Sequence, residues 1–201
     1  GNGARCFAKF VHDQKLTGKK QLRVETTAGL IELHYDNPKK IRAAVGIPEF
    51  TPSNIPFDAD ETALTYPLQV ADETLEIAAL AIGNPHAVLR VEDVDTAPVA
   101  ELGPLIESHR RFPEKTNVGF MQVISRHEIR LRVYERGAGE TLACGSGACA
   151  AVVAGIRQDL LDSPVTATLK GGTLEISWPG GSEPVTLTGS ATTVFQGRIR
   201  I

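Results

Sequence analysis

The stretch ERGAGETLACGSGACA, residues 135–150, decides the local fold. A strand-like pattern leads into it, glycine turns stand on both sides of Cys144, and a run of small apolar residues follows. Gly145 and Gly147 leave the backbone amides uncovered, so the stretch predicts a helix that begins beside a thiol. Such amides attract anions and lower the pKa of a nearby thiol. Cys144 is therefore a candidate reactive thiolate next to a site for a carboxylate or phosphate.

The composition and net charge argue against two classes of binding partner, nucleic acids and membranes. The 201 residues carry 21 Lys and Arg against 24 Asp and Glu, a net charge of −3, whereas domains that bind nucleic acid or acidic membranes carry a cationic excess. The longest apolar stretch, residues 148–156, is shorter than the ~20 residues that cross a bilayer, and no signal peptide pattern is present. We expect a cytoplasmic globular protein with no nucleic-acid or membrane partner.

Alternation of Val, Ile and Thr with polar residues predicts more strand than helix. We expect strands at residues 21–27, 30–35, 118–125 and 127–135, and helices at residues 4–13, 104–111 and 147–160. Gly, Ser or Pro marks each helix start.

An internal repeat relates the beginning of the chain to its last third. GNGARCFAKFV at residues 1–11 aligns with GSGACAAVVAG at residues 145–155. After a one-residue slip, AGLIELHY at residues 28–35 aligns with GGTLEISW at residues 171–178, and Gly46 then matches Gly189. Three matches in one order indicate two copies of one unit.

The repeat predicts two domains. Residues 47–189 would form the second, C-terminal domain, and residues 1–46 the tail of a first, N-terminal domain. We expect residues 190–201 to form a strand that returns to complete the first domain. The chain begins at Gly1 and has a single methionine, and we interpret it as the larger part of a longer protein.

The other two cysteines are predicted to be core residues. Cys149 lies in a run of Ala and Val, well round the helix from Cys144. Cys6 lies beside Phe7 and Phe10 in the first predicted helix. Three cysteines make no disulfide framework in a reducing compartment. A zinc site from two of them and a histidine would lack paired, closely spaced ligands, so we expect no metal.

Polar side chains gather at the ends of predicted strands. Asn84 and His86 lie in GNPH after an apolar strand, and Asn117 opens another strand in TNVG. Glu135 and Arg136 stand together where a strand ends. Each group alone has an ordinary explanation, as a turn, a loop histidine or a solvated charge pair. Their combination with the cysteine and its glycines indicates a site.

GNGAR, GNPHA, TNVGF and ERGAGETLACGSGACA, in this order, closely resemble the diaminopimelate epimerase family over essentially the whole chain. The resemblance implies an α+β fold of two pseudo-symmetric, β-rich domains, each wrapped around a central helix. Each domain of the family contributes one cysteine before the glycine turn of its helix. By the repeat, the partner of Cys144 is expected immediately before Gly1. The first domain is thus expected to be incomplete here, and these 201 residues alone to be inactive.

The resemblance also implies the reaction, an isomerisation that interconverts LL- and meso-diaminopimelate for lysine and peptidoglycan precursor synthesis. The family uses no pyridoxal phosphate, and no cofactor is expected. Without an electron sink, a thiolate on one face of the α-carbon must remove the proton while a thiol on the other face delivers one. Two helix N-termini would stabilise the charge in a cleft closed to water.

At the reacting end of the substrate, Cys144 matches the family's proton acceptor. The resemblance implies that the α-carboxylate is held by the amides of Gly1, Asn2, Gly145 and Ser146. His86 and Glu135 match the pair that adjusts the thiol pKa values, which suits an imidazole and a carboxylate near a thiol.

At the distal end, the resemblance implies that Asn84, Asn117 and Arg136 bind the second carboxylate and that Glu135 accepts from the second ammonium. A guanidinium fork suits a carboxylate. The family's dimer contact is a tyrosine in the last strand, and Phe195 stands there with the ring but without the hydroxyl. The resemblance therefore implies a homodimer.

Two other functions fit parts of the sequence. A related two-cysteine racemase for a substrate without a distal charge, such as proline, would leave the polar groups at Asn84, Asn117 and Arg136 unpaired. A non-catalytic module with one thiol would bind an amino acid at one helix terminus only. Its first helix, without surrounding strands, would expose an apolar face to water.

Overall fold

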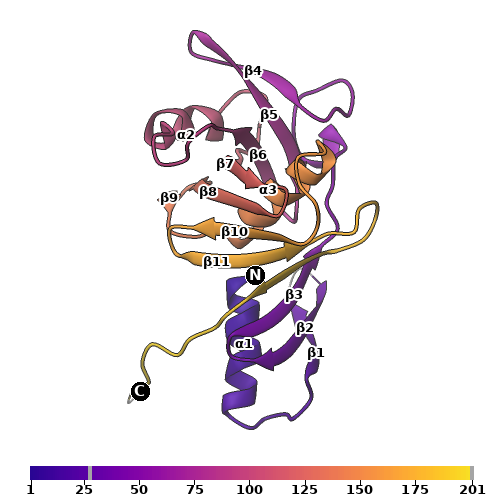
Figure 1. Cartoon of the computed structure of the whole chain (residues 1–201), viewed down its shortest axis with the longest axis vertical. Coiled ribbons are helices and arrows are strands. Elements are labelled where there is room, and N and C mark those ends of the chain that lie inside the picture. The colour runs from indigo at the N-terminus through magenta and orange to yellow at the C-terminus, as the bar shows by residue number, and fades with distance from the viewer. Residues whose placement is uncertain (27–28, 200–201) are drawn as a thin grey trace. The chain divides into compact units, whose positions relative to one another are not determined.

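The computed structural model describes residues 1–26 and 29–199 (Figure 1) and divides into two compact units. Unit 1 comprises Gly1–Ala44 and the tail from Thr188, and unit 2 comprises Val45–Leu187. The domain boundaries proposed from the repeat lie two residues from these divisions. Helices and a mixed sheet are both present, so the prediction of an α+β fold is confirmed.

The helices are α1 (Asn2–Asp13), α2 (Val99–Glu107) and α3 (Gly145–Arg157), with a 3-10 helix η1 (Pro52–Asn54). The strands are β1 (Gln21–Thr26), β2 (Gly29–Asn37), β3 (Lys40–Gly46), β4 (Tyr66–Val70), β5 (Glu73–Ala81), β6 (Pro85–Arg90), β7 (Asn117–Ser125), β8 (Glu128–Glu135), β9 (Gly139–Thr141), β10 (Val165–Leu169), β11 (Gly172–Ser177) and β12 (Val185–Gly189). The predicted strands are confirmed to within two residues over their described parts; Thr27 lies outside the described residues.

Two of the three predicted helices are confirmed, and each starts two residues earlier than expected. The third prediction, residues 104–111, is wrong, because α2 begins at Val99 and ends at Glu107 with Pro104 inside it. Val99 and Ile106 are buried on the face of α2 that meets the sheet. The burial of these side chains against the sheet therefore outweighs the preference of Pro104 for the first turn of a helix.

Unit 2 is a sheet that curves around α3 (Figure 1). Its strands follow the order β11-β10-β8-β7-β6-β5-β4, with β9 beside β8. The pairs β10–β8 and β6–β7 are parallel, and the other pairs are antiparallel. α3 contacts β5, β6, β7, β8, β10 and β11, and every residue from Gly147 to Gly155 is buried. The uniformly apolar sequence of α3 is that of a helix enclosed on all sides, and Cys149 is a core residue as predicted.

A second layer covers the opposite face of the same sheet. Alternate residues of β5 point to the two faces, so that Leu80 packs in the core with α3 while Ile77 packs in the core with α2. A Cβ atom on Gly103 would lie 2.5 Å from the ring of Tyr134, so glycine is needed for α2 to lie this close to β8. This approach sets the place of the C-terminal end of α2.

Unit 1 is smaller and covers its helix on one side. α1 contacts β2 of the antiparallel sheet β1-β2-β3, and Ala8 and Val11 are its buried apolar residues. Phe7 and Phe10 are 44% and 54% exposed, and Cys6 is also exposed. The prediction that Cys6 is a core residue is wrong, because the strands described in unit 1 cover only the opposite face of α1.

The segments aligned by the repeat fold alike. α1, β1, β2 and β3 follow in the same order as α3, β10, β11 and β12. Gly29 and Gly172 each open the second strand of a hairpin with φ values of 110° and 134°, a region that favours glycine. Gly46 and Gly189 each end the strand that follows the hairpin.

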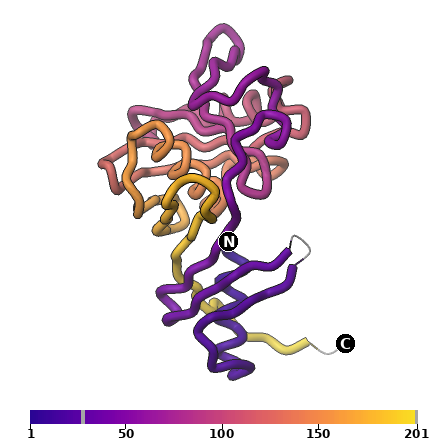
Figure 2. The backbone as a smooth tube through the Cα atoms, turned by 90° about the vertical axis from the view of Figure 1, so that its right-hand side faces the viewer, coloured from indigo at the N-terminus to yellow at the C-terminus, as the bar shows by residue number. Residues whose placement is uncertain are grey.

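The strand predicted at residues 190–201 is wrong over its described part, which ends at residue 199. Figure 2 shows this tail, in yellow, passing beside α1 of unit 1. Ala191 N–H donates to Pro38 O at 2.9 Å, and Arg5 Nε donates to Ser190 O at 3.2 Å. The tail does return to unit 1, but scattered bonds of this kind are not the regular ladder that defines a strand.

In the part of the chain that the structure describes, no helix is both long and apolar enough to cross a membrane.

Candidate functional site

The polar residues singled out in the sequence meet at one edge of the unit 2 sheet. His86 pairs with Asn117 in the parallel ladder, so β6 and β7 begin side by side. The antiparallel pairing of Val118 with Tyr134 brings the end of β8 to the same edge. Asn84 directly precedes β6, Glu135 is the last residue of β8, and Arg136 follows it.

Cys144 is the N-cap residue of α3 and is only 5% exposed. Its Sγ lies 3.6 Å from the Ser146 hydroxyl. A Cβ atom on Gly147 would lie 3.3 Å from this sulfur and 3.2 Å from Val133 Cγ2. Gly147 thus provides the room in which the thiol lies against the first turn of the helix.

Burial and a hydrogen bond to the Glu135 carboxylate raise the pKa of Cys144 from 9.0 to about 11, against the Ser146 hydroxyl and the Gly147 amide, which lower it. The expectation of a lowered thiol pKa is therefore wrong for this state of the protein. Helix amides do favour the thiolate, but removal from water and an adjacent carboxylate outweigh them. The side chain is a protonated thiol that faces a potential base.

Glu135 is held in place from the neighbouring strand. Thr141 Oγ1 donates a hydrogen bond to Glu135 Oε1 at 2.5 Å. Both residues lie on the β8–β9 hairpin, whose turn contains Gly137 and Gly139 with φ values of 75° and 80°. Thr141 was not among the predicted site residues, although the glycines of ERGAGET mark the turn that brings it beside Glu135.

The Glu135→Gln variant should shift the titration of Cys144 downward, because a neutral amide no longer repels the thiolate. Burial remains, so we expect the pKa to stay above 9.0 while falling below about 11. The pH dependence of alkylation by iodoacetamide, followed on the peptide that contains Cys144, measures this pKa. An unchanged titration of Cys144 in Glu135→Gln would show that Glu135 does not face the thiol.

The raised pKa of Cys144 also affects the stability of the fold. The native protein holds the thiol proton more tightly than the unfolded chain, so this stabilisation is complete below pH 9.0 and is lost as the pH rises toward about 11.

Arg136 lines a pocket of about 420 Å³, together with Glu49, Asn54, Asn84 and Glu114, and Cys144 is not among the residues that line it. Its Nη1 donates to Glu114 O at 3.0 Å, and its backbone N–H donates to Asn117 Oδ1 at 3.0 Å. At the end of β8, the carboxylate of Glu135 thus contacts the thiol, while the side chain of the adjacent Arg136 lines the pocket.

Asn117 is buried and both ends of its amide are in use. Oδ1 accepts from Arg136 N–H, and Nδ2 donates to Pro85 O at 3.0 Å. One Nδ2 hydrogen is left for a further acceptor. Through these two hydrogen bonds, the side chain of Asn117 on β7 connects β6 to the loop after β8.

His86 is fully buried, and burial together with the positive charge of Arg136 lowers its pKa to about 3. The imidazole is therefore neutral at physiological pH. Its Nε2 is 3.0 Å from Asn84 Oδ1, and with Nε2 protonated it donates there and leaves the NH₂ group of Asn84 for another acceptor. The residues that shift the pKa of Cys144 are Glu135, Ser146 and Gly147, and His86 is not one of them.

Two carboxylates escaped the sequence analysis. Glu49 accepts hydrogen bonds from the backbone of Phe50 and Thr51 and from Asn54, and these bonds lower its pKa to about 2. Glu107, at the end of α2, is 7% exposed and accepts from Gly137 N–H at 2.8 Å. A glutamate at a helix end or turn has no sequence signal that separates it from a solvated one.

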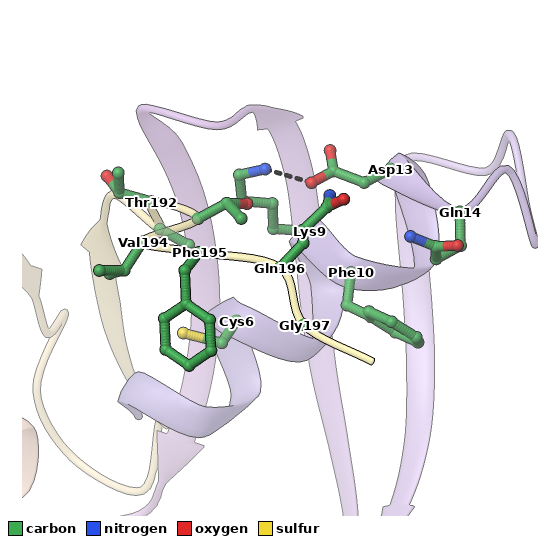
Figure 3. Close-up of a pocket in the computed structure, with 12 residues that line it drawn as sticks. Cys6, Lys9, Phe10, Asp13, Gln14, Thr192, Val194, Phe195, Gln196 and Gly197 are labelled. Carbon is green, nitrogen blue, oxygen red and sulfur yellow. Dashed lines mark hydrogen bonds and ion pairs between the residues drawn. The ribbon is translucent and has the colours of Figure 1, made fainter. Parts of the chain in front are cut away.

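Three of the predicted site residues belong to unit 1. Gly1 is the N-cap of α1, and Asn2 is its first residue, with Asn2 Oδ1 accepting from Arg5 Nη2 at 2.6 Å. Phe195 is 83% exposed and lies over Cys6 in a pocket of about 560 Å³ (Figure 3). The described tail therefore leaves the ring of Phe195 available to another surface.

Among residues 1–26 and 29–199, no group of three or more His, Cys, Asp or Glu side chains is arranged to hold a metal ion.

Comparison with known proteins gives one family. Residues 78–194 match the family described as diaminopimelate epimerase. The chain is 58% identical to a diaminopimelate epimerase of Pseudomonas entomophila and 59% identical to one of Chromobacterium violaceum. Each match covers all of this chain and 73% of the relative.

Solved structures with the same fold are more distant. A probable proline racemase from Agrobacterium radiobacter has a TM-score of 0.68 at 14% identity, covering 100% of this chain and 67% of that chain. A hydroxyproline epimerase from Agrobacterium vitis has a TM-score of 0.65 at 14% identity, covering 94% and 63%. At such identity these likenesses show the fold alone.

Proposed function

The chain belongs to the diaminopimelate epimerase family, and from this membership we propose that the protein is an isomerase that interconverts LL- and meso-2,6-diaminopimelate in lysine and peptidoglycan precursor synthesis. The chain spans 73% of the length of its curated relatives. The observation that carries the proposal is a buried thiol at a helix N-terminus with the carboxylate of Glu135 beside it, while the next residue, Arg136, lines a pocket.

At the reacting end, the amides of Gly145 and Ser146 hold the α-carboxylate, because the N-terminus of α3 carries partial positive charge. The Cys144 thiol passes its proton to the Glu135 carboxylate, and the resulting thiolate accepts the α-proton. The electron pair left on the α-carbon spreads into the α-carboxylate, where the amides stabilise it. A thiol whose pKa is raised to about 11 needs such an acceptor beside it before it can serve as the base.

Inversion requires a second acid on the opposite face of the α-carbon. The repeat predicts a cysteine immediately before Gly1, where it would precede α1 as Cys144 precedes α3. The amides of Gly1 and Asn2 would then hold the α-carboxylate from their own helix N-terminus. His86 does not shift the pKa of Cys144, so its proposed action on a thiol pKa, as a neutral imidazole, concerns the cysteine expected before Gly1.

At the distal end, we assign the second carboxylate to Arg136, Asn84 and Asn117, and the second ammonium to Glu135. The free NH₂ of Asn84 and the guanidinium that lines the pocket support this assignment. Proline has no second carboxylate for the guanidinium of Arg136 or the NH₂ group of Asn84, so it would make none of the contacts that this pocket offers. Diaminopimelate should therefore be turned over, and proline should not.

We expect the reaction to need no cofactor and the enzyme to work in the cytoplasm, where thiols stay reduced. A homodimer that uses the surface around Phe195 fits the exposure of that ring.

Solvent-deuterium incorporation tests the function directly. The protein, expressed from its complete coding sequence and incubated with LL-diaminopimelate in D₂O, should place deuterium at the α-carbon as the meso isomer forms. Mass spectrometry and chiral chromatography measure the two products, with proline as the comparison substrate. Folded protein with reduced thiols that exchanges no α-hydrogen would contradict the proposal.

A further inference from the structure

We infer that Glu107 is a positioning residue, which fixes the backbone at Arg136 and Gly137 and thereby sets the affinity for the distal carboxylate of the substrate. The inference rests on the proposed function. It concerns a side chain outside the pocket, on a different element from every residue assigned above.

Glu107 holds two loops at once. Its Oε1 accepts from Gly137 N–H at 2.8 Å, in the turn that follows β8. Its backbone O accepts from Thr116 N–H at 3.1 Å, directly before Asn117 opens β7. Lys115 Nζ lies 3.6 Å from the same carboxylate oxygen. The end of α2 therefore joins the loop that carries Arg136 to the loop that carries Asn117.

The packing of α2 on β8 brings the Glu107 carboxylate close to the loop that follows β8. Gly103 lets α2 approach Tyr134, since a Cβ atom at that position would lie 2.5 Å from its ring. Glu107 follows Gly103 by four residues and lies on the same face of the helix. Tyr134 is two residues before Arg136 on β8, so the helix approach and the carboxylate contact act on the same short segment.

Arg136 is restrained at three successive points by these contacts. Asn117 Oδ1 accepts from its own N–H, Glu114 O accepts from its guanidinium, and Glu107 accepts from the next N–H along the chain. A guanidinium binds a carboxylate best when its fork is already oriented, because less side-chain freedom is lost on binding. Release of the Gly137 amide should therefore weaken substrate binding more than it slows the chemistry at Cys144.

A matched pair of variants separates reach from charge. Glu107→Gln keeps the length and an acceptor oxygen but loses the charge, whereas Glu107→Asp keeps the charge and shortens the reach by one methylene. If Glu107 acts by accepting from Gly137, Glu107→Asp should raise KM for diaminopimelate about tenfold with kcat within about threefold. Glu107→Gln should keep KM within about threefold of the unmodified protein. Glu101→Gln, in the first turn of the same helix, is the control and should change neither constant.

Hydrogen exchange at the Gly137 amide gives a readout that does not depend on turnover. The amide should lose protection in Glu107→Asp and keep it in Glu107→Gln. The reverse order in KM, or a fall in kcat at unchanged KM, would overturn the inference, as would an amide that stays protected in Glu107→Asp. An unmodified protein that fails to exchange the α-hydrogen of diaminopimelate would instead overturn the proposed function, and the amide measurement would still decide whether Glu107 holds the loop.

Discussion

Replacement of Cys144 by alanine should slow α-proton exchange with diaminopimelate by about 10³-fold or more, since general acid–base catalysis typically contributes 10²–10⁴-fold and no other group takes over the proton. The thiol is buried at the start of α3 and faces Glu135, so the variant leaves a carboxylate without its proton donor. The rate of deuterium incorporation per enzyme molecule, measured in D₂O on protein expressed from its complete coding sequence, gives the loss. Cys144→Ser should remain nearly as slow, because a hydroxyl is a much weaker acid than a thiol.

Cys149→Ala is the matched control for this prediction. Cys149 lies five residues further along the same helix in the core, so its removal costs packing but leaves the reacting end intact. We expect an activity close to that of the unmodified protein and a loss of about 1 kcal/mol in the free energy of unfolding. Retained exchange in Cys144→Ala, with Cys149→Ala equally active, would place the proton acceptor elsewhere.

Local sequence patterns correctly predicted those features of the site whose backbone conformation is set by nearby residues. The glycines around Cys144 specify a helix start, and α3 begins within one residue of that cysteine. The repeat likewise aligned Gly29 with Gly172, and both glycines open the second strand of a hairpin. In these places the backbone conformation depends on residues a few positions apart, which is the range that a sequence pattern reports.

The errors concern properties that depend on what covers a residue. Cys6 has the neighbours of a core residue, but the described strands of unit 1 cover the other face of α1. The pKa of Cys144 was expected to fall with the helix amides, yet burial and Glu135 raise it. Desolvation is a property of the assembled fold, and it carries the opposite sign to the local effect here.

The missed residues have the same origin. Glu107 and Gly137 are 30 positions apart, and their contact exists only because α2 packs on β8. In the sequence, Glu107 stands in a polar stretch that fits any exposed helix end. The candidate site could therefore be named from motifs, but the network that holds Arg136 could not.

Replacement of Arg136 by methionine should lower kcat/KM for diaminopimelate by about 10²-fold or more, because hydrogen bonds to charged groups contribute about 1.5–3 kcal/mol each and a guanidinium can make two to a carboxylate. Methionine keeps the aliphatic stem of the side chain, while the pocket that also contains Asn84 loses its cation. Arg136→Lys should fall between the two, since it keeps the charge without the planar fork. Steady-state kinetics on the three proteins, together with circular dichroism of each, measure the effect.

Arg130→Met supplies the control because Arg130 lies on β8, which ends directly before Arg136, but pairs with Asp95 at the surface, at 2.8 Å. Exposed pairs of this kind contribute little, so its kinetics should match those of the unmodified protein. A second consequence follows inside the site, where the charge of Arg136 helps to lower the pKa of His86. In Arg136→Met this pKa should rise while staying below its ordinary value, because burial, the larger cause, is unchanged. Equal kinetics for Arg136→Met and Arg130→Met would mean that the distal carboxylate is bound somewhere other than this pocket.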